Sequence, residues 1–218
     1  RERFYPIPAR IGDGTLPAIV PCIPRLDIEV PGETSPTAWA SKSPLPFEPW
    51  IKHSLADGLI GELTFVELRS TGSANINPNA MTWREQVEYS GEQVLAMGIY
   101  AETLNAWVGP YETLAANVST PMGTKTIDGK EVEVKIPQVV SITGQLANGA
   151  VCHEHHMGIA VDKSTPVNEV TLFGTEGTIR HAFLSGEIYY APKGQPLAKV
   201  DVPAELIEDW QVESDFIN

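Results

Sequence analysis

Residues 83–110, WREQVEYSGEQVLAMGIYAETLNAWVGP, decide the fold. Ser90, followed three residues later by Gln93, matches a capping box, in which each side chain satisfies a free backbone N–H of the other residue. Beyond it, apolar residues recur every three or four positions, as on one buried face of a helix; they are Val94, Met97, Ala101, Leu104 and Val108. Gly109 and Pro110 end the pattern, because glycine accepts a positive φ and proline cannot continue a helix. We therefore predict a helix over 90–108 on which the core is built.

Short strands surround this helix. Before it, residues 49–58 predict a short helix that starts with a proline, and residues 62–70 alternate like a strand with one buried face. After it, alternation and turn signals predict strands at 111–120, 131–136, 139–146, 151–159, 167–173, 178–183 and 187–190. Asn148-Gly149 is the strongest hairpin signal, because this pair tolerates the left-handed geometry of a type I′ turn, and Asp128-Gly129 is a second such signal.

One long helix followed by consecutive antiparallel strands indicates an α+β fold. We expect an open, mainly antiparallel β-sheet with helices packed on one face. The other face of such a sheet must also be covered, and a second copy of the chain is the simplest cover. The sequence therefore predicts a homo-oligomer that forms through the open sheet face.

The first 49 residues differ from the rest by their many prolines, which favour extended chain and edge-type strands. Two interpretations stay open for this Pro-rich N-terminal arm: a surface arm or insertion, or an arm exchanged between subunits. Residues 50–218 are expected to form the folded domain. The chain has no initiator Met, and residues 205–218 resemble a helix that is cut while still running. We therefore expect a fragment of a longer protein.

The composition of the 218 residues excludes several classes of protein. With 42% hydrophobic and 20% charged residues the chain is ordinary globular protein, and no apolar run approaches the roughly 18 residues of a membrane helix. A net charge of −13 opposes binding to a phosphate backbone, so no nucleic-acid partner is expected. Cys22 and Cys152 lie far apart and predict two free thiols, which favours a reducing compartment and hence the cytoplasm.

The common nucleotide-binding and metal patterns are absent or incomplete. Gly12-Asp13-Gly14 begins like a dinucleotide fingerprint, but Pro17 stands where the third glycine belongs. His153 and His155 lie on one face of a predicted strand and could bind a metal with a third ligand. No third ligand is identifiable by spacing, so we expect polar or interface histidines and no metal. We expect no dinucleotide to bind this chain alone.

Tyr100 is the main candidate for chemistry. It lies at the edge of the predicted apolar stripe, where a phenol can exchange a proton with a carbonyl or an alcohol. The alternative is a tyrosine at the rim of the core whose hydroxyl bonds the backbone. Trp83 and Arg84, just before the helix, could present an aromatic wall and a cation to a polyol or carboxylate. Their alternative is a packed tryptophan beside a solvated arginine.

Several short motifs follow one another between residues 50 and 218: GLIGE at 58–62, WR at 83–84, GIY at 98–100, WVG at 107–109, GQLANG at 144–149, FGTEGT at 173–178 and DFI at 215–217. In this order they resemble the C-terminal domain of the glucose–fructose oxidoreductase / inositol dehydrogenase / MocA family. The resemblance implies an open sheet of the dihydrodipicolinate-reductase-like type, which supplies substrate contacts and the oligomer interface beside a separate Rossmann domain that holds NAD(P).

The resemblance also implies roles for single residues. The central helix of the family typically carries Asp-x-Gly-x-His or Asp-x-Gly-x-Tyr, and Tyr100 falls on the latter tyrosine, which implies an acid/base role. Ala96 stands at the aspartate position, so the neighbouring carboxylate is missing. The family's Glu-Lys-Pro lysine and its nucleotide domain are also absent from this chain.

These observations predict the C-terminal substrate-binding and oligomerisation domain of an NAD(P)-dependent oxidoreductase acting on a sugar, polyol or related cyclic alcohol. NAD or NADP is expected in the intact protein, at residues this chain does not reveal, and this chain is not expected to be active alone. The alternative is a non-catalytic binding or dimerisation module derived from the same family.

Overall fold

The computed structural model describes residues 47–91, 94–162, 164 and 167–207. The helices are α1 (Glu48–Ala56), α2 (Val87–Ser90) and α3 (Met97–Val108), with two 3-10 turns, η2 (Trp83–Glu85) and η3 (Ala204–Leu206). The strands are β1 (Leu63–Thr71), β2 (Tyr111–Ser119), β3 (Thr124–Ile127), β4 (Lys130–Glu133), β5 (Val139–Leu146), β6 (Val151–Met157), β7 (Val167–Gly174), β8 (Gly177–Ala182), β9 (Glu187–Pro192) and β10 (Ala198–Lys199).

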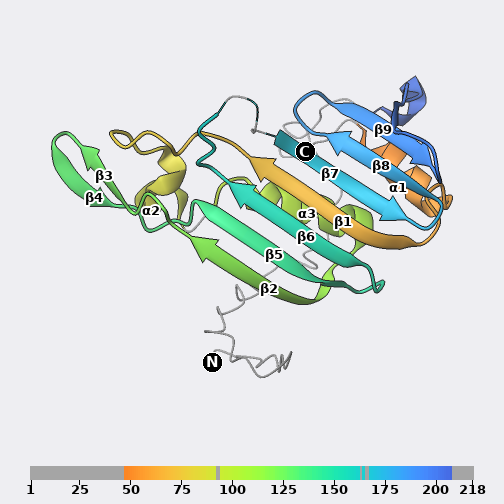
Figure 1. Cartoon of the computed structure of the whole chain (residues 1–218), viewed down its shortest axis with the longest axis horizontal. Coiled ribbons are helices and arrows are strands. Elements are labelled where there is room, and N and C mark those ends of the chain that lie inside the picture. The colour runs from red at the N-terminus through yellow and green to blue at the C-terminus, as the bar shows by residue number, and fades with distance from the viewer. Residues whose placement is uncertain (1–46, 92–93, 163, 165–166, 208–218) are drawn as a thin grey trace, which may run out of the picture.

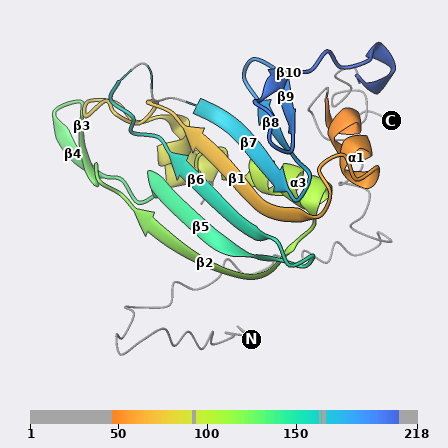
Figure 2. The same ribbon diagram turned by 45° about the vertical axis from the view of Figure 1, so that its right-hand side comes forward.

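Within the described residues, eight strands form one sheet in the order β10-β9-β8-β7-β1-β6-β5-β2, and β3 and β4 pair separately. Only β1 and β6 run parallel; the other neighbours in this sheet are antiparallel. Figure 1 shows the sheet in front with α3 crossing behind it, and Figure 2 shows α1 and α3 on that same side. The predicted open, mainly antiparallel sheet with helices on one face is confirmed.

The core lies between the sheet and these helices. Alternation along β1 sends Val66 and Leu68 inward, where both are fully buried. They belong to one cluster with Leu104 and Trp107 of α3 and with Ile51 of α1. Burying each such side chain contributes about 1.5–3 kcal/mol relative to leaving it in water. The helix-facing side of the sheet is therefore the side on which the chain is held together.

The predicted start of the central helix is wrong. Ser90 ends α2 instead of capping α3, because its hydroxyl donates back to the carbonyl oxygen of Gln86 at 3.2 Å. Gly91 and Leu95 then take positive φ angles of 62° and 50°, which turn the chain before α3 begins at Met97. Gln93, the other half of the predicted capping box, lies outside the described residues.

The predicted buried stripe of this helix is confirmed only in part, since Leu104 and Val108 are buried as predicted. Ala101 is exposed, whereas the buried residues of α3 are Thr103, Leu104, Trp107 and Val108. Thr103 is tolerated there because its hydroxyl donates to the carbonyl oxygen of Ile99 at 2.9 Å, which satisfies it inside the helix. The stripe therefore runs from Tyr100 to Trp107, so the predicted edge residue Tyr100 packs against the core.

Both predicted hairpins are present, but the type I′ geometry predicted for Asn148-Gly149 is wrong and occurs at Asp128-Gly129 instead. Asp128 and Gly129 both take positive φ, 51° and 74°, as a type I′ turn requires. At the β5–β6 turn only Gly149 does so. Asn148 has a different use: its side chain accepts the Ala150 N–H at 3.0 Å and donates to the carbonyl oxygen of Val108 at 3.2 Å. This side chain ties the hairpin to the end of α3.

Three further predictions concern parts of the chain that the structure covers only partly. The Pro-rich arm falls, except for residues 47–49, outside the described residues, as does Cys22. Cys152 is a free thiol buried in the core. Within the described ranges, no helix is long and apolar enough to cross a membrane.

Candidate functional site

Tyr100 lies in the first turn of α3, above a row of polar side chains that three neighbouring strands supply. Asn168 of β7, Ser70 of β1 and His156 of β6 are register partners across the sheet. The Tyr100 hydroxyl donates to Asn168 Oδ1 at 2.9 Å, and the Ser70 hydroxyl donates to the same oxygen at 2.8 Å. The alternative of a hydroxyl bonded to backbone is therefore not what this structure has. One side-chain acceptor holds two hydroxyl groups.

The ring of Tyr100 is held by aromatic neighbours. Its centroid lies 4.9 Å from that of Phe183 and 6.1 Å from that of His156. The side chain is partly buried, so the phenol is neither sealed in the core nor free in water. Helix and sheet together fix the ring, which is the arrangement that a proton-exchanging phenol needs.

A buried chain of polar groups continues behind this ring. The Tyr111 hydroxyl donates to Glu154 Oε1 at 2.7 Å, and Glu154 Oε2 lies 2.9 Å from His156 Nε2. Glu154 and His156 are 1% and 0% exposed, so the pair is shielded from water. His156 Nδ1 has no hydrogen-bond partner among the described residues. Sequence patterns do not reveal Glu154 and His156 as members of this site, because their burial depends on which strand face meets α3.

Burial sets the protonation states of the two phenols. It raises the pKa of Tyr100 above its ordinary value, and the Ser70 hydroxyl opposes this by favouring the phenolate. Burial, and then the neighbouring charge of Glu154, raise the pKa of Tyr111 much further. At neutral pH both groups keep their protons. The Tyr100 hydroxyl therefore keeps the hydrogen that it donates to Asn168 Oδ1.

The structure places the other two predicted site residues, Trp83 and Arg84, in η2. Trp83 is 49% exposed, and the Arg84 guanidinium lies 4.2 Å from the centroid of the Trp83 ring. Arg84 Nε is buried without a partner among the described residues, so this arginine is not a simple solvated charge. Figures 1 and 2 show the adjacent α2 on the same side of the sheet as α3. No direct contact between this pair and Tyr100 is observed.

A buried ion pair anchors η2. Sequence patterns do not predict this pair. Glu85, the last residue of η2, lies 2.8 Å from Lys125 Nζ, and both side chains are almost completely buried. Lys125 also donates to the carbonyl oxygens of Asn75 and Ala80 at 3.0 Å each. Gln138 Nε2 donates to Glu85 Oε1 at 3.0 Å. All hydrogen atoms of the ammonium group thus have acceptors, which is what allows a lysine to be buried.

Ala96 stands directly before α3 as its N-cap residue, without a side-chain cap. A carboxylate at this position would lie at the positive end of the helix dipole, close to the phenol in the next turn. The methyl group of alanine supplies neither charge nor hydrogen bond. Any proton exchange at Tyr100 therefore depends on groups from the sheet.

His153 and His155 share the open face of the sheet, as predicted, because β6 alternates inward and outward. The Ser141 hydroxyl lies 3.2 Å from His153 Nε2. In the described part of the chain, no group of three or more His, Cys, Asp or Glu side chains could hold a metal ion.

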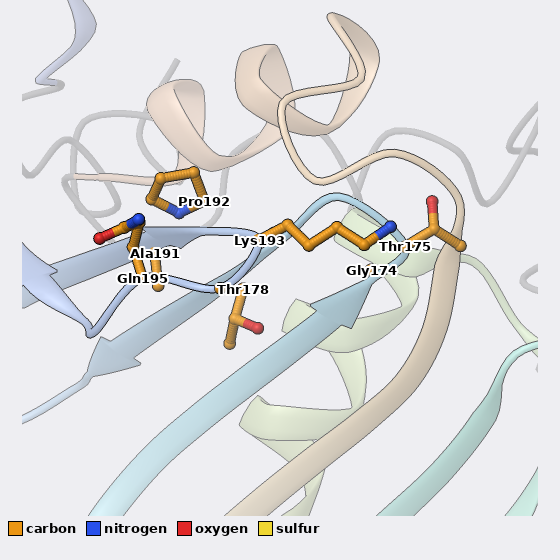
Figure 3. Close-up of a pocket in the computed structure, with 9 residues that line it drawn as sticks. Gly174, Thr175, Thr178, Ala191, Pro192, Lys193 and Gln195 are labelled. Atoms are coloured by element: carbon orange, nitrogen blue, oxygen red, sulfur yellow. The ribbon is translucent and has the colours of Figure 1, made fainter.

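A separate hollow lies at the opposite end of the strands from Tyr100. It has a volume of about 240 Å³ and is open to solvent between the β7–β8 turn and the end of β9. Figure 3 shows Thr175, Thr178 and Lys193 at its wall. Lys193 is paired with Glu176 at 3.1 Å, and both side chains are exposed. None of the predicted site residues lines this hollow.

In the described residues, Tyr100 thus lies on a helix that crosses one face of an open, mainly antiparallel sheet. Residues 50–180 match the model of the GFO/IDH/MocA C-terminal domain, and the chain belongs to this family. The family resemblance of the sequence motifs is thereby confirmed. A comparison with curated proteins gave no match.

Solved structures with the same fold include dehydrogenases. A levoglucosan dehydrogenase in complex with NADH and L-sorbose superposes with a TM-score of 0.65 at 19% identity, over 77% of this chain and 52% of that one. An NAD-binding oxidoreductase from Klebsiella pneumoniae gives 0.64 at 18%, over 73% and 45%. An inositol dehydrogenase homologue with NAD⁺ from Azotobacter vinelandii gives 0.62 at 12%, over 77% and 45%. The chain thus spans about half the length of these structures.

Proposed function

We propose that this chain is the substrate-binding and oligomerisation domain of an NAD(P)-dependent oxidoreductase that acts on a sugar, polyol or related cyclic alcohol. The observation that carries the proposal is the Tyr100 hydroxyl, held by Asn168 at 2.9 Å on the helix-covered face of the sheet. Membership of the family and the named substrates and cofactors of the similar structures support it.

The cofactor would be held elsewhere in the intact protein. The described residues contain no strand, glycine-rich turn and helix in succession, so they do not fit a dinucleotide. The nicotinamide would supply or accept the hydride. The part assigned to this chain is to bind the substrate, exclude water and provide a proton at Tyr100 Oη as the substrate oxygen becomes negative.

We also propose that the protein works in the cytoplasm, as the free thiol of Cys152 suggests.

The first test of this proposal is the gene upstream of the codon for Arg1. An oxidoreductase requires a Gly-x-Gly-x-x-Gly turn between a strand and a helix, followed by Glu-Lys-Pro, as the resemblance implies. The intact protein should then bind NAD or NADP in an equilibrium titration. A longer gene product without that unit, and without affinity for either nucleotide, would contradict the proposal.

Trp83 and Arg84 are proposed to contact the substrate. Exposed aromatic surface stacked on a cation suits the apolar face and hydroxyl groups of a sugar or polyol. In the intact enzyme, Arg84→Met is expected to raise KM about 10- to 100-fold while kcat changes little, because it removes binding rather than the proton step. Steady-state kinetics measures both. Lys193→Met, in the hollow at the opposite end of the strands, serves as the control and should leave KM unchanged. A KM unaffected by Arg84→Met would remove Arg84 from the substrate site.

The open sheet face is proposed to be the oligomer interface. Phe65 and Phe173 lie side by side on it at 5.8 Å, only partly buried, among the polar residues of β1, β6 and β7. We expect light scattering to report at least two chains per particle. Phe173→Lys should shift this towards the monomer, since a buried unpaired charge opposes association. Leu184→Lys changes a turn residue that is 81% exposed; it is the control and should leave the oligomeric state unchanged. A wild-type monomer at micromolar concentration would contradict the interface.

The alternative, a non-catalytic binding or dimerisation module, is favoured by Ala96. Without a carboxylate beside the phenol, and with burial raising the pKa of Tyr100, the site is a weak acid–base centre. The two functions differ in one result: a module binds its partner or itself without any nicotinamide-dependent turnover.

A further inference from the structure

Asn168 Oδ1 accepts two hydroxyl hydrogens, one from Tyr100 and one from Ser70, at 2.9 and 2.8 Å. The two hydroxyl groups therefore share one acceptor. Ser70 is 8% exposed, so water competes little for its hydrogen. A serine hydroxyl rotates freely about its C–O bond and can turn its hydrogen from one acceptor to another. Tyr100 thus has a potential hydrogen-bond donor beside it.

We propose that Ser70 and Asn168 are positioning residues that control the proton of Tyr100. Asn168 holds the phenol hydrogen while Tyr100 is neutral, and Ser70 turns its own hydrogen onto the phenolate once the proton has left. Only the transfer of this proton to a substrate rests on the proposed function; the effect of Ser70 on the ionisation of Tyr100 does not. It gives the site the stabilising group that Ala96 cannot provide.

The proton step balances within the site. The Oη–H bond of Tyr100 breaks, and an O–H bond forms on the substrate oxygen, which has become negative as its carbon is reduced. A phenolate is left on Tyr100. The Ser70 hydrogen then moves from Asn168 Oδ1 to Tyr100 Oη by rotation, and no further covalent bond changes. The reverse sequence serves alcohol oxidation, in which the phenolate takes up the hydroxyl proton.

The electrostatics agree with this assignment. Burial raises the pKa of Tyr100, and the Ser70 hydroxyl is the group that acts against burial. The titratable groups that face the phenol ring are His156, at 6.1 Å between ring centroids, and Glu154 behind it. Neither donates a hydrogen bond to the Tyr100 oxygen in the described structure. Among these groups, Ser70 is therefore the one that can donate a hydrogen bond to the phenolate.

Titration of Tyr100 in the full chain tests the proposal without any substrate. Incorporated 3-fluorotyrosine titrates at lower pH than tyrosine, and fluorine NMR follows each residue; loss of a signal in Tyr100→Phe assigns it. Ser70→Ala is expected to move the Tyr100 midpoint to higher pH, and Ser70→Thr, which keeps a hydroxyl, to restore it. Asn168→Asp should also raise the midpoint, because a carboxylate beside the phenol opposes its ionisation.

Two variants on the opposite face of the sheet are matched controls. Ser141→Ala and Asn117→Asp should leave the Tyr100 midpoint unchanged, since both residues belong to the open face. In the intact enzyme, Ser70→Ala should lower kcat about 10- to 150-fold with little change in KM, as expected for losing a hydrogen bond to a charged group. An unchanged Tyr100 midpoint in Ser70→Ala overturns the proposal, even in an active enzyme. An inactive enzyme with a shifted midpoint overturns the proposed function only.

Discussion

Replacing Tyr100 with phenylalanine in the intact protein is expected to lower kcat by about 10²- to 10⁴-fold, the usual contribution of a positioned proton donor. KM should change little, because the ring remains and only the hydroxyl is lost. The ring contacts with Phe183 and His156 are kept, so the fold should be preserved. Steady-state kinetics and a thermal melt of the same sample measure the two effects separately.

The control for this result is Tyr111→Phe, which also removes a buried phenol hydroxyl. The Tyr111 hydroxyl bonds Glu154 and not Asn168, so its loss should affect stability more than kcat.

The expected pH dependence follows from the direction of the pKa shift of Tyr100. Since the pKa of Tyr100 is raised, the protonated form persists to higher pH than for a free phenol. Reduction of a substrate carbonyl with the proton of Tyr100 should therefore stay fast through neutral pH. An equal kcat in wild type and Tyr100→Phe would remove Tyr100 from the mechanism.

Lys125→Met is expected to lower the free energy of unfolding by about 3–5 kcal/mol, the cost of leaving a buried partner charge unpaired. Glu85 would lose its ion pair at 2.8 Å, and two carbonyl oxygens would lose their donor. The residues held by this network include η2, so substrate binding through Trp83 and Arg84 should also weaken. Urea unfolding followed by tryptophan fluorescence gives the free energy, and the position of Trp83 makes the probe sensitive to η2.

Lys193→Met is the matched control for Lys125→Met. Its ion pair with Glu176 at 3.1 Å has a similar length, but both partners are exposed, so its loss should cost at most about 1 kcal/mol. The double variant Lys125→Met with Glu85→Gln should recover part of the stability, because the unpaired charge is then gone. Equal small effects of Lys125→Met and Lys193→Met would show that the buried pair does not anchor η2.

The sheet could be predicted from the sequence because its signals are local. Val66 and Leu68 alternate with polar neighbours, and Asp128-Gly129 and Asn148-Gly149 mark turns wherever they occur. The start of α3 could not be predicted in this way. Ser90 has the residue type of an N-cap, but its hydroxyl bonds the preceding turn, and the positive φ angles of Gly91 and Leu95 show where the chain bends.

The site was predictable only in part. Tyr100 is recognisable from its place on the helix and from the family motif, whereas Ser70, His156 and Asn168 lie far from it in the sequence. These three residues are neighbours because of the strand register, which the spacing of residues along the sequence does not predict. The burial of Lys125 likewise depends on contacts between distant residues, which local sequence patterns do not predict. A lysine on a short strand is normally solvated. The burial of Lys125 depends on acceptors far away in the sequence, the carbonyl oxygens of Asn75 and Ala80 and the carboxylate of Glu85.

We propose that the proton of Tyr100 serves a nicotinamide-dependent reaction of a polyhydroxylated substrate. The most direct measurement follows nicotinamide absorbance with the intact protein, NAD⁺ or NADP⁺, and a panel of sugars, anhydrosugars and inositols. We expect reduction of one nucleotide by at least one member of the panel and loss of that rate in Tyr100→Phe. Turnover that is unchanged by Tyr100→Phe, or an intact protein that reduces neither nucleotide with any of them, would contradict it.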